Sequence, residues 1–369
     1  MNICIEAHVL NHHRRSGLMT YTQGLITSMQ QWDKDNHYTL AYYSLRRNRE
    51  DMPGPLGNNF QKAVIRVPDQ EFPGRQWGVD HLALPGFLKA HKIRIFHRTC
   101  GYTIPAVNNV FRILTVHDLR TLTIADQKWK QNITHYKKTL QALDACVVVS
   151  ECTKGDLLKH FSMDERKIRV IYLGADRRFH PCDQKDIEAV KAKYGIKGPF
   201  LLSIGSVPRK NIDGTIRAFA AAKASKNFVL VLGCNMDVDK YKQLAVFLGV
   251  EQKILFLDCL DDQEIVALYS GCRCFVFPSF YEGFGLPILE AMQCGAPVIT
   301  SNVSSCPEVA GDAAILVNPD NIQEISDAID QMCQNENLRQ GFIQKGVQRS
   351  KLFNWDTYAR EMKKVYDLA

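Results

Sequence analysis

Two glutamates eight residues apart, Glu282 and Glu290, flank a glycine-containing turn and the start of an expected helix. A short apolar run before the turn predicts a buried parallel strand, and Pro287 suits the first turn of a helix, where a missing N–H costs little. Gly283 and Gly285 let the backbone approach a ligand closely. A helix N-terminus offers N–H groups and about half a positive charge. The stretch therefore predicts a phosphate cradle with two carboxylates for sugar hydroxyls, or else a turn that only packs strand against helix.

Two adjacent cations, Arg209 and Lys210, follow the apolar run 200–205 and precede an expected helix that begins at Ile212. This order places them in a loop at the carboxyl end of a strand, where parallel sheets bind their ligands. Arginine offers a forked donor and lysine a compact charge, which suits a diphosphate. The alternative is a solvated basic loop. We favour the binding interpretation because the surrounding half of the chain is net negative.

Three other groupings could hold a metal, and we interpret each of them otherwise. Asp237-Val-Asp239 is interpreted as helix capping, because aspartate favours N-caps. The run 12–15, His-His-Arg-Arg, is interpreted as an exposed basic loop. The twelve cysteines include no CxxC pair, and Cys272-Arg-Cys274 has the wrong spacing for a metal knuckle. We therefore expect free thiols and no metal site.

The elements that position these residues alternate between short apolar runs and stretches of helical length. Continuous apolar strands that alternate with helices are typical of parallel sheets covered on both faces. The runs are too many for one sheet, and glycine and proline interrupt the pattern at 173–197. We therefore expect an α/β chain with two doubly wound domains. The expected strands are Ile3–Val9, Tyr38–Tyr43, Ala63–Val67, Arg94–Phe96, Phe111–Val116, Ala145–Val149, Arg169–Tyr172, Phe200–Gly205, Phe228–Leu232, Ile254–Leu257, Cys274–Pro278, Pro297–Thr300 and Ala313–Val317.

Composition supports two domains with different partners. The 369 residues are 46% hydrophobic, which excludes wholesale disorder. Of the net charge of +7, residues 1–172 carry +9 and residues 173–369 carry −2. No run reaches the roughly 20 apolar residues that span a bilayer, and the N-terminus lacks the order of a secretory signal. We expect a cytoplasmic protein.

The motifs together resemble the GT-B glycosyltransferases of family 4, the group 1 transferases. The E-x7-E pattern from Glu282 to Glu290 lies in PSFYEGFGLPILEAMQCGAPVIT, and SNVSSCPEVAGDAAILVNP (301–319) continues the likeness. SIGSVPRKNIDGTIRAF (203–219), TVHDL (115–119) and VVSECTKGDL (148–157) are also similar to the family. Residues 1–110 contribute mainly Ser16-Gly17-Leu18.

The resemblance implies two Rossmann-like domains that face a central cleft. Residues 1–173 would bind the acceptor, residues 174–354 the nucleotide sugar, and the C-terminal helix 355–369 would cross back onto the first domain. Glu290 would hold the ribose, and Glu282 would hold the sugar together with the amides of residues 284–286. Arg209 and Lys210 would neutralise the diphosphate. The other implied positions are Gly17, Gly205, Leu260, Gly283, Phe284, Gly285 and Leu286 for the donor, His117 facing the donor sugar, and Asp118, Arg14 and Arg15 for the acceptor.

The implied activity is a retaining transfer of a hexosyl group to a hydroxyl of a glycan or lipid-linked glycan, as in polysaccharide or lipopolysaccharide biosynthesis. We expect no cofactor and no metal, with GDP-mannose favoured as the donor substrate. The basic first half fits an anionic acceptor or an anionic membrane surface that carries it, and hence peripheral membrane association.

Two positions depart from the family, and two other functions stay open. Ser206 stands where many members have arginine, and Asp258 stands where many have glycine, so the base is not fixed by the motifs. One rival is a sugar-nucleotide epimerase of the same fold. The other is an inactive scaffold or nucleic-acid-binding protein that uses the basic half, although no arrangement of aromatics among basic residues indicates a nucleic-acid module.

Overall fold

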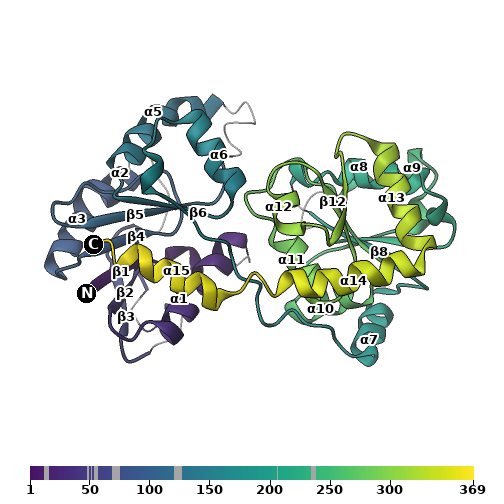
Figure 1. Cartoon of the computed structure of the whole chain (residues 1–369), viewed down its shortest axis with the longest axis horizontal. Helices are drawn as coiled ribbons and strands as arrows, with labels where there is room; N and C mark the ends of the chain where they lie inside the picture. The colour runs from purple at the N-terminus through teal and green to yellow at the C-terminus, as the bar shows by residue number, and fades with distance from the viewer. Residues whose placement is uncertain are drawn as a thin grey trace. The chain divides into compact units, whose positions relative to one another are not determined.

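The computed structural model describes residues 1–11, 16–47, 50, 52–53, 57–68, 75–119, 127–205, 207–233 and 238–369. The chain divides into two compact units (Figure 1). Unit 1 consists of Met1–Gly174 and Trp355–Ala369, and unit 2 of Ala175–Asn354. The sequence places the boundary one residue earlier, between 173 and 174.

Unit 1 is built on seven parallel strands in the order β3-β2-β1-β4-β5-β6-β7. The chain runs outward from β1 to β3 and then from β4 to β7, so the strand order reverses between β1 and β4. That reversal is where doubly wound sheets bind ligands, at the carboxyl ends of the strands. The strands are β1 (Asn2–Glu6), β2 (His37–Tyr43), β3 (Phe60–Ile65), β4 (Ile95–Arg98), β5 (Phe111–Val116), β6 (Ala145–Val148) and β7 (Ile168–Val170), and the helices are α1 (Gly17–Trp32), α2 (Arg75–Gly78), α3 (Leu84–Ala90), α5 (Gln127–Ala142), α6 (Glu151–His160) and α15 (Trp355–Tyr366).

Unit 2 has six parallel strands in the order β10-β9-β8-β11-β12-β13, and its order reverses between β8 and β11. Both motifs with expected chemistry follow these two central strands. The strands are β8 (Phe200–Ile204), β9 (Val229–Gly233), β10 (Ile254–Leu257), β11 (Phe275–Phe277), β12 (Val298–Ser301) and β13 (Ala314–Val317), and the helices are α7 (Gln184–Tyr194), α8 (Ile212–Ala221), α9 (Asp239–Phe247), α10 (Asp262–Gly271), α11 (Leu286–Gln293), α12 (Cys306–Ala310), α13 (Ile322–Gln334) and α14 (Glu336–Ser350).

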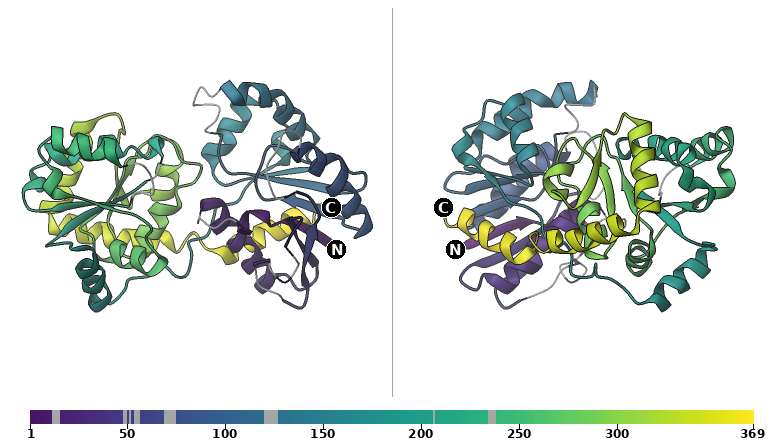
Figure 2. Two further views of the ribbon diagram at one scale, coloured as in Figure 1. Left: turned by 180° about the vertical axis from the view of Figure 1, so that it is seen from behind. Right: turned by 45° about the vertical axis from the view of Figure 1, so that its right-hand side comes forward.

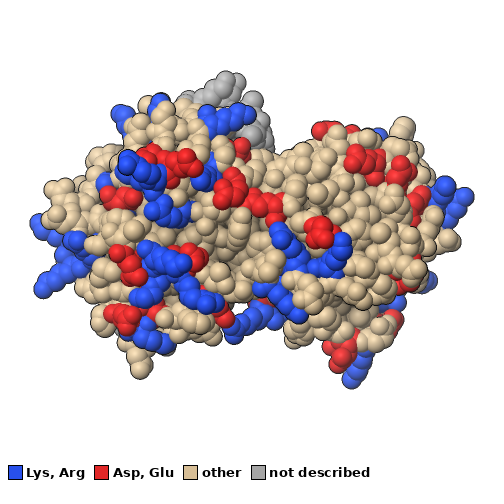
Figure 3. Space-filling model, viewed as in Figure 1, with Lys and Arg blue, Asp and Glu red and all other residues tan. Residues whose placement is uncertain are grey.

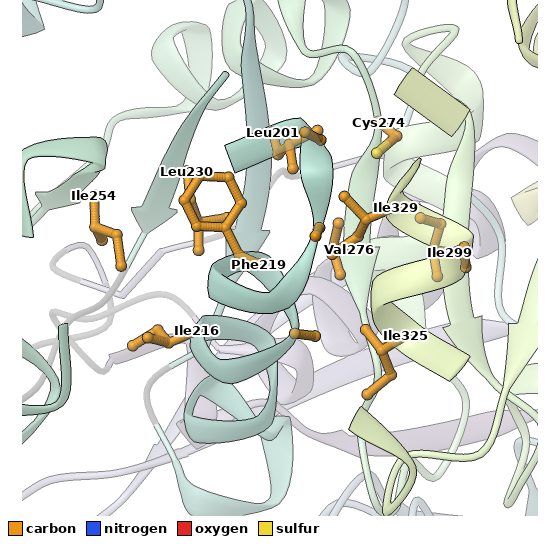
Figure 4. Packing of buried hydrophobic residues seen from close by; sticks show 14 of the residues in the cluster. Leu201, Ile216, Phe219, Leu230, Ile254, Cys274, Val276, Ile299, Ile325 and Ile329 are labelled. Carbon is orange, nitrogen blue, oxygen red and sulfur yellow. The ribbon is translucent and has the colours of Figure 1, made fainter. Parts of the chain in front are cut away.

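The core of unit 2 lies between its sheet and helices α8 and α13 (Figure 4). Ile325 and Ile329 recur at helical spacing on α13, and Ile216 and Phe219 do so on α8, so each helix turns one apolar face inward. Burial of each such side chain contributes about 1.5–3 kcal/mol. This packing holds the sheet, and therefore the loops at its carboxyl edge, in a fixed position.

Helix α15 returns to unit 1 and lies beside α1 in each view (Figures 1 and 2). The indole ring of Trp355, in α15, occupies the space that a side chain at position 24 would take. A Cβ at Gly24 would lie 2.3 Å from this ring. Glycine at position 24 therefore permits the two helices to approach closely. The chain termini also lie near each other in unit 1 (Figure 2).

A buried chain of hydrogen bonds fastens α15 to the sheet of unit 1. Tyr366 Oη lies 2.9 Å from His97 Nδ1, and His97 Nε2 lies 2.8 Å from Thr115 Oγ1. Thr115 Oγ1 lies 2.8 Å from Tyr21 Oη, which in turn lies 2.8 Å from Tyr358 Oη. Burial lowers the pKa of His97 to about 3, so this imidazole is neutral within the network.

The structure confirms the α/β architecture with two doubly wound sheets and corrects two local predictions. The strand expected over Ile3–Val9 ends at Glu6, and His8–Asn11 forms a 3-10 turn closed by the Leu10 N–H to the Ala7 carbonyl. Asp239 is not a cap, because Val238 occupies that position and Asp239 begins α9 itself. Asp237 lies outside the described residues.

None of the helices in the described parts of the chain is both long and apolar enough to cross a membrane. The structure also shows no disulfide between cysteines in these parts.

Candidate active site

The loop between β11 and α11 turns the side chain of Glu282 into the interior of unit 2. Glu282 is only 5% exposed. Its Oε1 accepts hydrogen bonds from Lys210 Nζ at 2.6 Å and Ser279 Oγ at 2.6 Å, and it lies 2.8 Å from Arg209 Nη1. Its other oxygen, Oε2, has no protein donor among the described residues. One oxygen thus holds the carboxylate in place while the other remains available to a ligand hydroxyl.

The two cations predicted from the sequence converge on this one carboxylate. They lie in a 3-10 turn, Pro208–Lys210, between β8 and α8. Arg209 Nη1 also donates to the Tyr281 carbonyl at 2.8 Å, and the Arg209 carbonyl accepts from the Phe280 N–H at 2.8 Å. Lys210 Nζ lies 4.5 Å from the centre of the Phe277 ring. The loops after β8 and β11 are therefore tied together by side chains and backbone.

These contacts set the charge of the site. Burial raises the pKa of Glu282, but the neighbouring Lys210 and Arg209 outweigh burial and hold that pKa below its ordinary value. Burial lowers the pKa of Lys210, and Glu282 opposes that change. Two cations against one carboxylate leave an excess of positive charge at the carboxyl edge of the sheet, which suits an anionic ligand.

The start of α11 supplies the backbone donors that the sequence predicts. Gly285 has a φ of 105°, a left-handed conformation that favours glycine. The N–H groups of Gly285 and Leu286 have no acceptor among the described residues. Phe284 packs its ring against Phe353, with centroids 5.8 Å apart, so its side chain serves the core. The loop thus presents amides at a helix N-terminus, where anions bind.

Two glycines make room for site side chains. A Cβ at Gly205 would lie 2.6 Å from the Lys210 Cβ, so only glycine lets the lysine pack across the end of β8. A Cβ at Gly233 would lie 3.2 Å from Leu260 Cδ1, and Leu260 itself is partly buried over the end of β9. Gly283 is also partly buried in the turn before α11.

Glu290 lies one turn into α11 and is half-buried. The Tyr269 hydroxyl donates to its Oε2 at 3.3 Å. Burial raises the pKa of Glu290 to about 7; the Tyr269 hydrogen bond opposes this increase, and the charge of Asp176 adds to it. Asp262 also raises this pKa and is paired with Arg178 at 2.9 Å. Glu290 can therefore exchange a proton near neutral pH.

Unit 1 holds the other predicted residues. His117 follows β5, and its Nε2 lies 2.8 Å from the Thr99 carbonyl while its ring meets that of Tyr21 edge-on at 4.5 Å. Burial lowers the pKa of His117. Asp118 is partly buried beside it. Gly17 begins α1, and no neighbouring atom of the described residues lies within 4 Å of its Cβ position. Arg14 and Arg15, like Ser206 in unit 2, lie outside the described residues.

Comparison with known proteins assigns the family. Residues 186–349 match the family described as Glycosyl transferases group 1, and residues 20–179 match Glycosyltransferase Family 4. The O-antigen chain mannosyltransferase B of Escherichia coli is 32% identical over 291 residues, which cover 76% of each chain. The chain is a group 1 glycosyltransferase. It belongs to family 4, as the motifs predict.

This group 1 glycosyltransferase is also similar to a longer mannosyltransferase and to a solved structure. The serotype-specific mannosyltransferase WbdA of Escherichia coli is 28% identical over 268 residues, which cover 69% of this chain but 33% of that longer protein. The Anabaena protein HepE, solved in complex with UDP and glucose, superposes with a TM-score of 0.76 at 17% identity over the whole of both chains. That likeness shows a shared fold, the GT-B fold expected from the sequence.

One buried cluster of the glycosyltransferase was not expected. Arg98, at the end of β4, is 2% exposed and lies 3.2 Å from Glu6 Oε2 and 2.7 Å from Asp80 Oδ1. Tyr43 Oη donates to Glu6 Oε1 at 2.6 Å. Such a paired buried charge fixes the ends of β1, β2 and β4 relative to one another. The sequence offers no signal for it, because the three charges are far apart along the chain.

Four hydroxyl residues of the glycosyltransferase also escaped prediction. Thr300, Ser301, Ser304 and Ser305 end β12 and lead into α12, and each donates to a backbone carbonyl in residues 277–284. The only signal in the sequence is a concentration of hydroxyl residues at 300–305, which by itself is typical of an ordinary loop.

Proposed function

We propose that the protein transfers a hexosyl group, with retention at the anomeric carbon, from a nucleotide diphosphate sugar to a hydroxyl of a glycan or lipid-linked glycan. The observation that carries this proposal is the convergence of Arg209 and Lys210 on Glu282 beside the amides of Gly285 and Leu286. Cations and a helix N-terminus suit a diphosphate, and a held carboxylate suits sugar hydroxyls. GDP-mannose is the favoured donor, because the relatives that are 32% and 28% identical are mannosyltransferases.

The proposed reaction breaks the bond between the sugar anomeric carbon and the phosphate oxygen. The acceptor oxygen bonds to the same face of that carbon, and its proton passes to the departing phosphate. Negative charge that grows on the diphosphate is stabilised by Arg209, Lys210 and the start of α11. These protein cations take the place that a divalent metal has in other transferases, so we propose a reaction that requires neither metal nor cofactor.

Unit 1 is proposed to bind the acceptor through Asp118, while His117, also at its carboxyl edge, is proposed to face the donor sugar. Its charge excess supports an anionic acceptor or membrane surface, although Figure 3 shows acidic and basic side chains interspersed over the face of unit 1 in view.

Peripheral membrane association predicts that, at low salt, the protein co-floats with vesicles that contain anionic lipid and does not co-float with neutral vesicles. Equal recovery with both would remove the membrane from the proposal.

A panel of nucleotide sugars without added acceptor tests the donor. We expect GDP-mannose to be hydrolysed slowly, GDP to raise the melting temperature more than UDP, and EDTA to leave hydrolysis unchanged. Turnover of UDP sugars alone would overturn the donor assignment. Formation of an epimeric nucleotide sugar, visible by NMR, would indicate the epimerase instead. Stabilisation by RNA but by no nucleotide diphosphate would contradict the transferase proposal.

Nucleotide affinity should increase with pH through the titration of Glu290. The neutral acid below about pH 7 accepts hydroxyl donors poorly, whereas the carboxylate above it accepts a pair of ribose hydroxyls. Because GDP favours the ionised form, its binding releases a proton, and affinity should be about tenfold higher at pH 8 than at pH 6. Glu290→Gln should remove this component. Titration calorimetry of both proteins measures it, and an unchanged pH slope in the variant would exclude Glu290 from the nucleotide site.

A further inference from the structure

The segment that joins β12 to α12 forms hydrogen bonds with the backbone of the loop that carries Glu282. Ser304 Oγ accepts from the Glu282 N–H at 3.1 Å and donates to the Glu282 carbonyl at 2.6 Å, so one hydroxyl engages both backbone groups of that residue. Ser305 Oγ lies 2.9 Å from the same carbonyl and 2.8 Å from the Phe284 carbonyl. A side chain fixed by its own backbone has fewer positions open to it.

The same contacts orient the amide that follows. In a trans peptide the C=O and N–H of one unit point in opposite directions. Ser305 draws the Phe284 carbonyl toward itself, so the Gly285 N–H of the same peptide unit points away from Ser305. Among the described residues, this amide at the start of α11 has no acceptor. A single buried hydroxyl therefore sets the direction of a donor in the candidate active site.

Ser304 adopts a conformation that side chains disfavour. Its φ is 59°, in the left-handed region, and it is one of five non-glycine residues with positive φ in the described parts of the chain. Glycine would adopt this backbone without strain. Serine at this position has a strained backbone, but it supplies the hydroxyl that hydrogen-bonds to the Glu282 backbone. Backbone strain of this kind concentrates at functional sites.

We propose that Ser304 and Ser305 are positioning residues for the donor sugar. They hold the Glu282 carboxylate and the Gly285 amide where the sugar and its attached phosphate must lie. This inference rests on the proposed function, because it takes Glu282 as a sugar contact. It concerns the sugar and its attached phosphate rather than the nucleoside, since the serine hydroxyls bond to the backbone of Glu282 and Phe284, whereas Glu290 bonds to Tyr269.

Ser304→Gly separates positioning from stability. The variant removes two hydrogen bonds but relieves the strained φ, and because these effects oppose one another its melting temperature should stay close to that of the unmodified protein. Its kcat/KM for GDP-mannose should fall about tenfold to a hundredfold, through misplacement of Glu282. Its affinity for GDP alone should stay within about threefold. Ser305→Ala should lower the same kcat/KM and should also weaken GDP binding, because Ser305 orients the Gly285 amide beside the phosphate. Val303→Ala, at an exposed position in the same loop, should change neither quantity.

The outcomes distinguish this inference from the proposed function. Full kcat/KM for GDP-mannose in both serine variants would overturn the positioning role while leaving the transferase intact. Equal losses of GDP and GDP-mannose affinity in Ser304→Gly would also overturn it, because a general distortion would then explain both. Absence of GDP-mannose turnover in the unmodified protein would contradict the proposed function itself.

Discussion

Lys210→Ala should lower kcat/KM for the nucleotide sugar by about 10²–10³-fold, the loss typical of one electrostatic donor at a developing oxyanion. The side chain is 14% exposed and its Nζ lies 2.6 Å from Glu282 Oε1, so its charge acts in a site with little water. The decrease should lie mainly in kcat, because charge on the diphosphate grows as the sugar leaves. Steady-state kinetics over a range of donor concentrations separates kcat from KM.

Two further variants test whether the loss is specific to Lys210 and whether charge alone restores activity. Lys242→Ala removes an exposed lysine of the same unit and should keep full activity. Lys210→Arg keeps the charge but not the shape that Gly205 accommodates, and should recover only part of the activity. Wild-type kcat in Lys210→Ala would exclude this lysine from stabilising the leaving group.

Glu282→Gln should cost both activity and stability. The neutral amide leaves Arg209 and Lys210 close together without a counter-charge, and breaking a buried ion pair in this way costs about 3 kcal/mol of unfolding free energy. The pKa of Glu282 is held below its ordinary value of 4.5. Its contribution to stability is therefore present at neutral pH and is lost as pH falls below about 4.5.

Urea denaturation at pH 7 and at pH 4 measures this contribution. The difference between the two proteins should shrink at the lower pH. Glu336→Gln, which removes an exposed carboxylate paired with Arg273 and Arg339, should leave the transition nearly unchanged. Loss of turnover should accompany the destabilisation, and GDP should restore part of the stability of Glu282→Gln by binding beside the two cations. A variant as stable and active as the parent would show that the carboxylate is not needed.

Much of the fold could be predicted because the relevant signals are local. The apolar runs mark every strand of both sheets to within a few residues, and Pro287 marks the start of α11. The proximity of Arg209, Lys210 and Glu282 could also be predicted, because all three follow central strands whose carboxyl ends lie at one edge of the sheet.

The rest depends on contacts between distant residues. The donor-binding role of Gly205 stays a prediction, and the sequence does not indicate that this glycine also makes room for the Lys210 side chain. Ser304 hydrogen-bonds to Glu282, which lies 22 positions earlier in the chain. Neither these hydrogen bonds nor the φ of 59° has a signature in the local sequence. Hydroxyl residues are common in loops, so only tertiary structure distinguishes these from their neighbours.

Helix α15 also has a consequence for how the chain is made. Because α15 follows unit 2, a ribosome must add some 180 residues after Gly174 before this helix exists. At bacterial or eukaryotic elongation rates that takes about 10–40 s. During this interval Tyr21 lacks its partner Tyr358, and Trp355 does not yet fill the space beside Gly24. The domain that is synthesised first is therefore the one that is completed last.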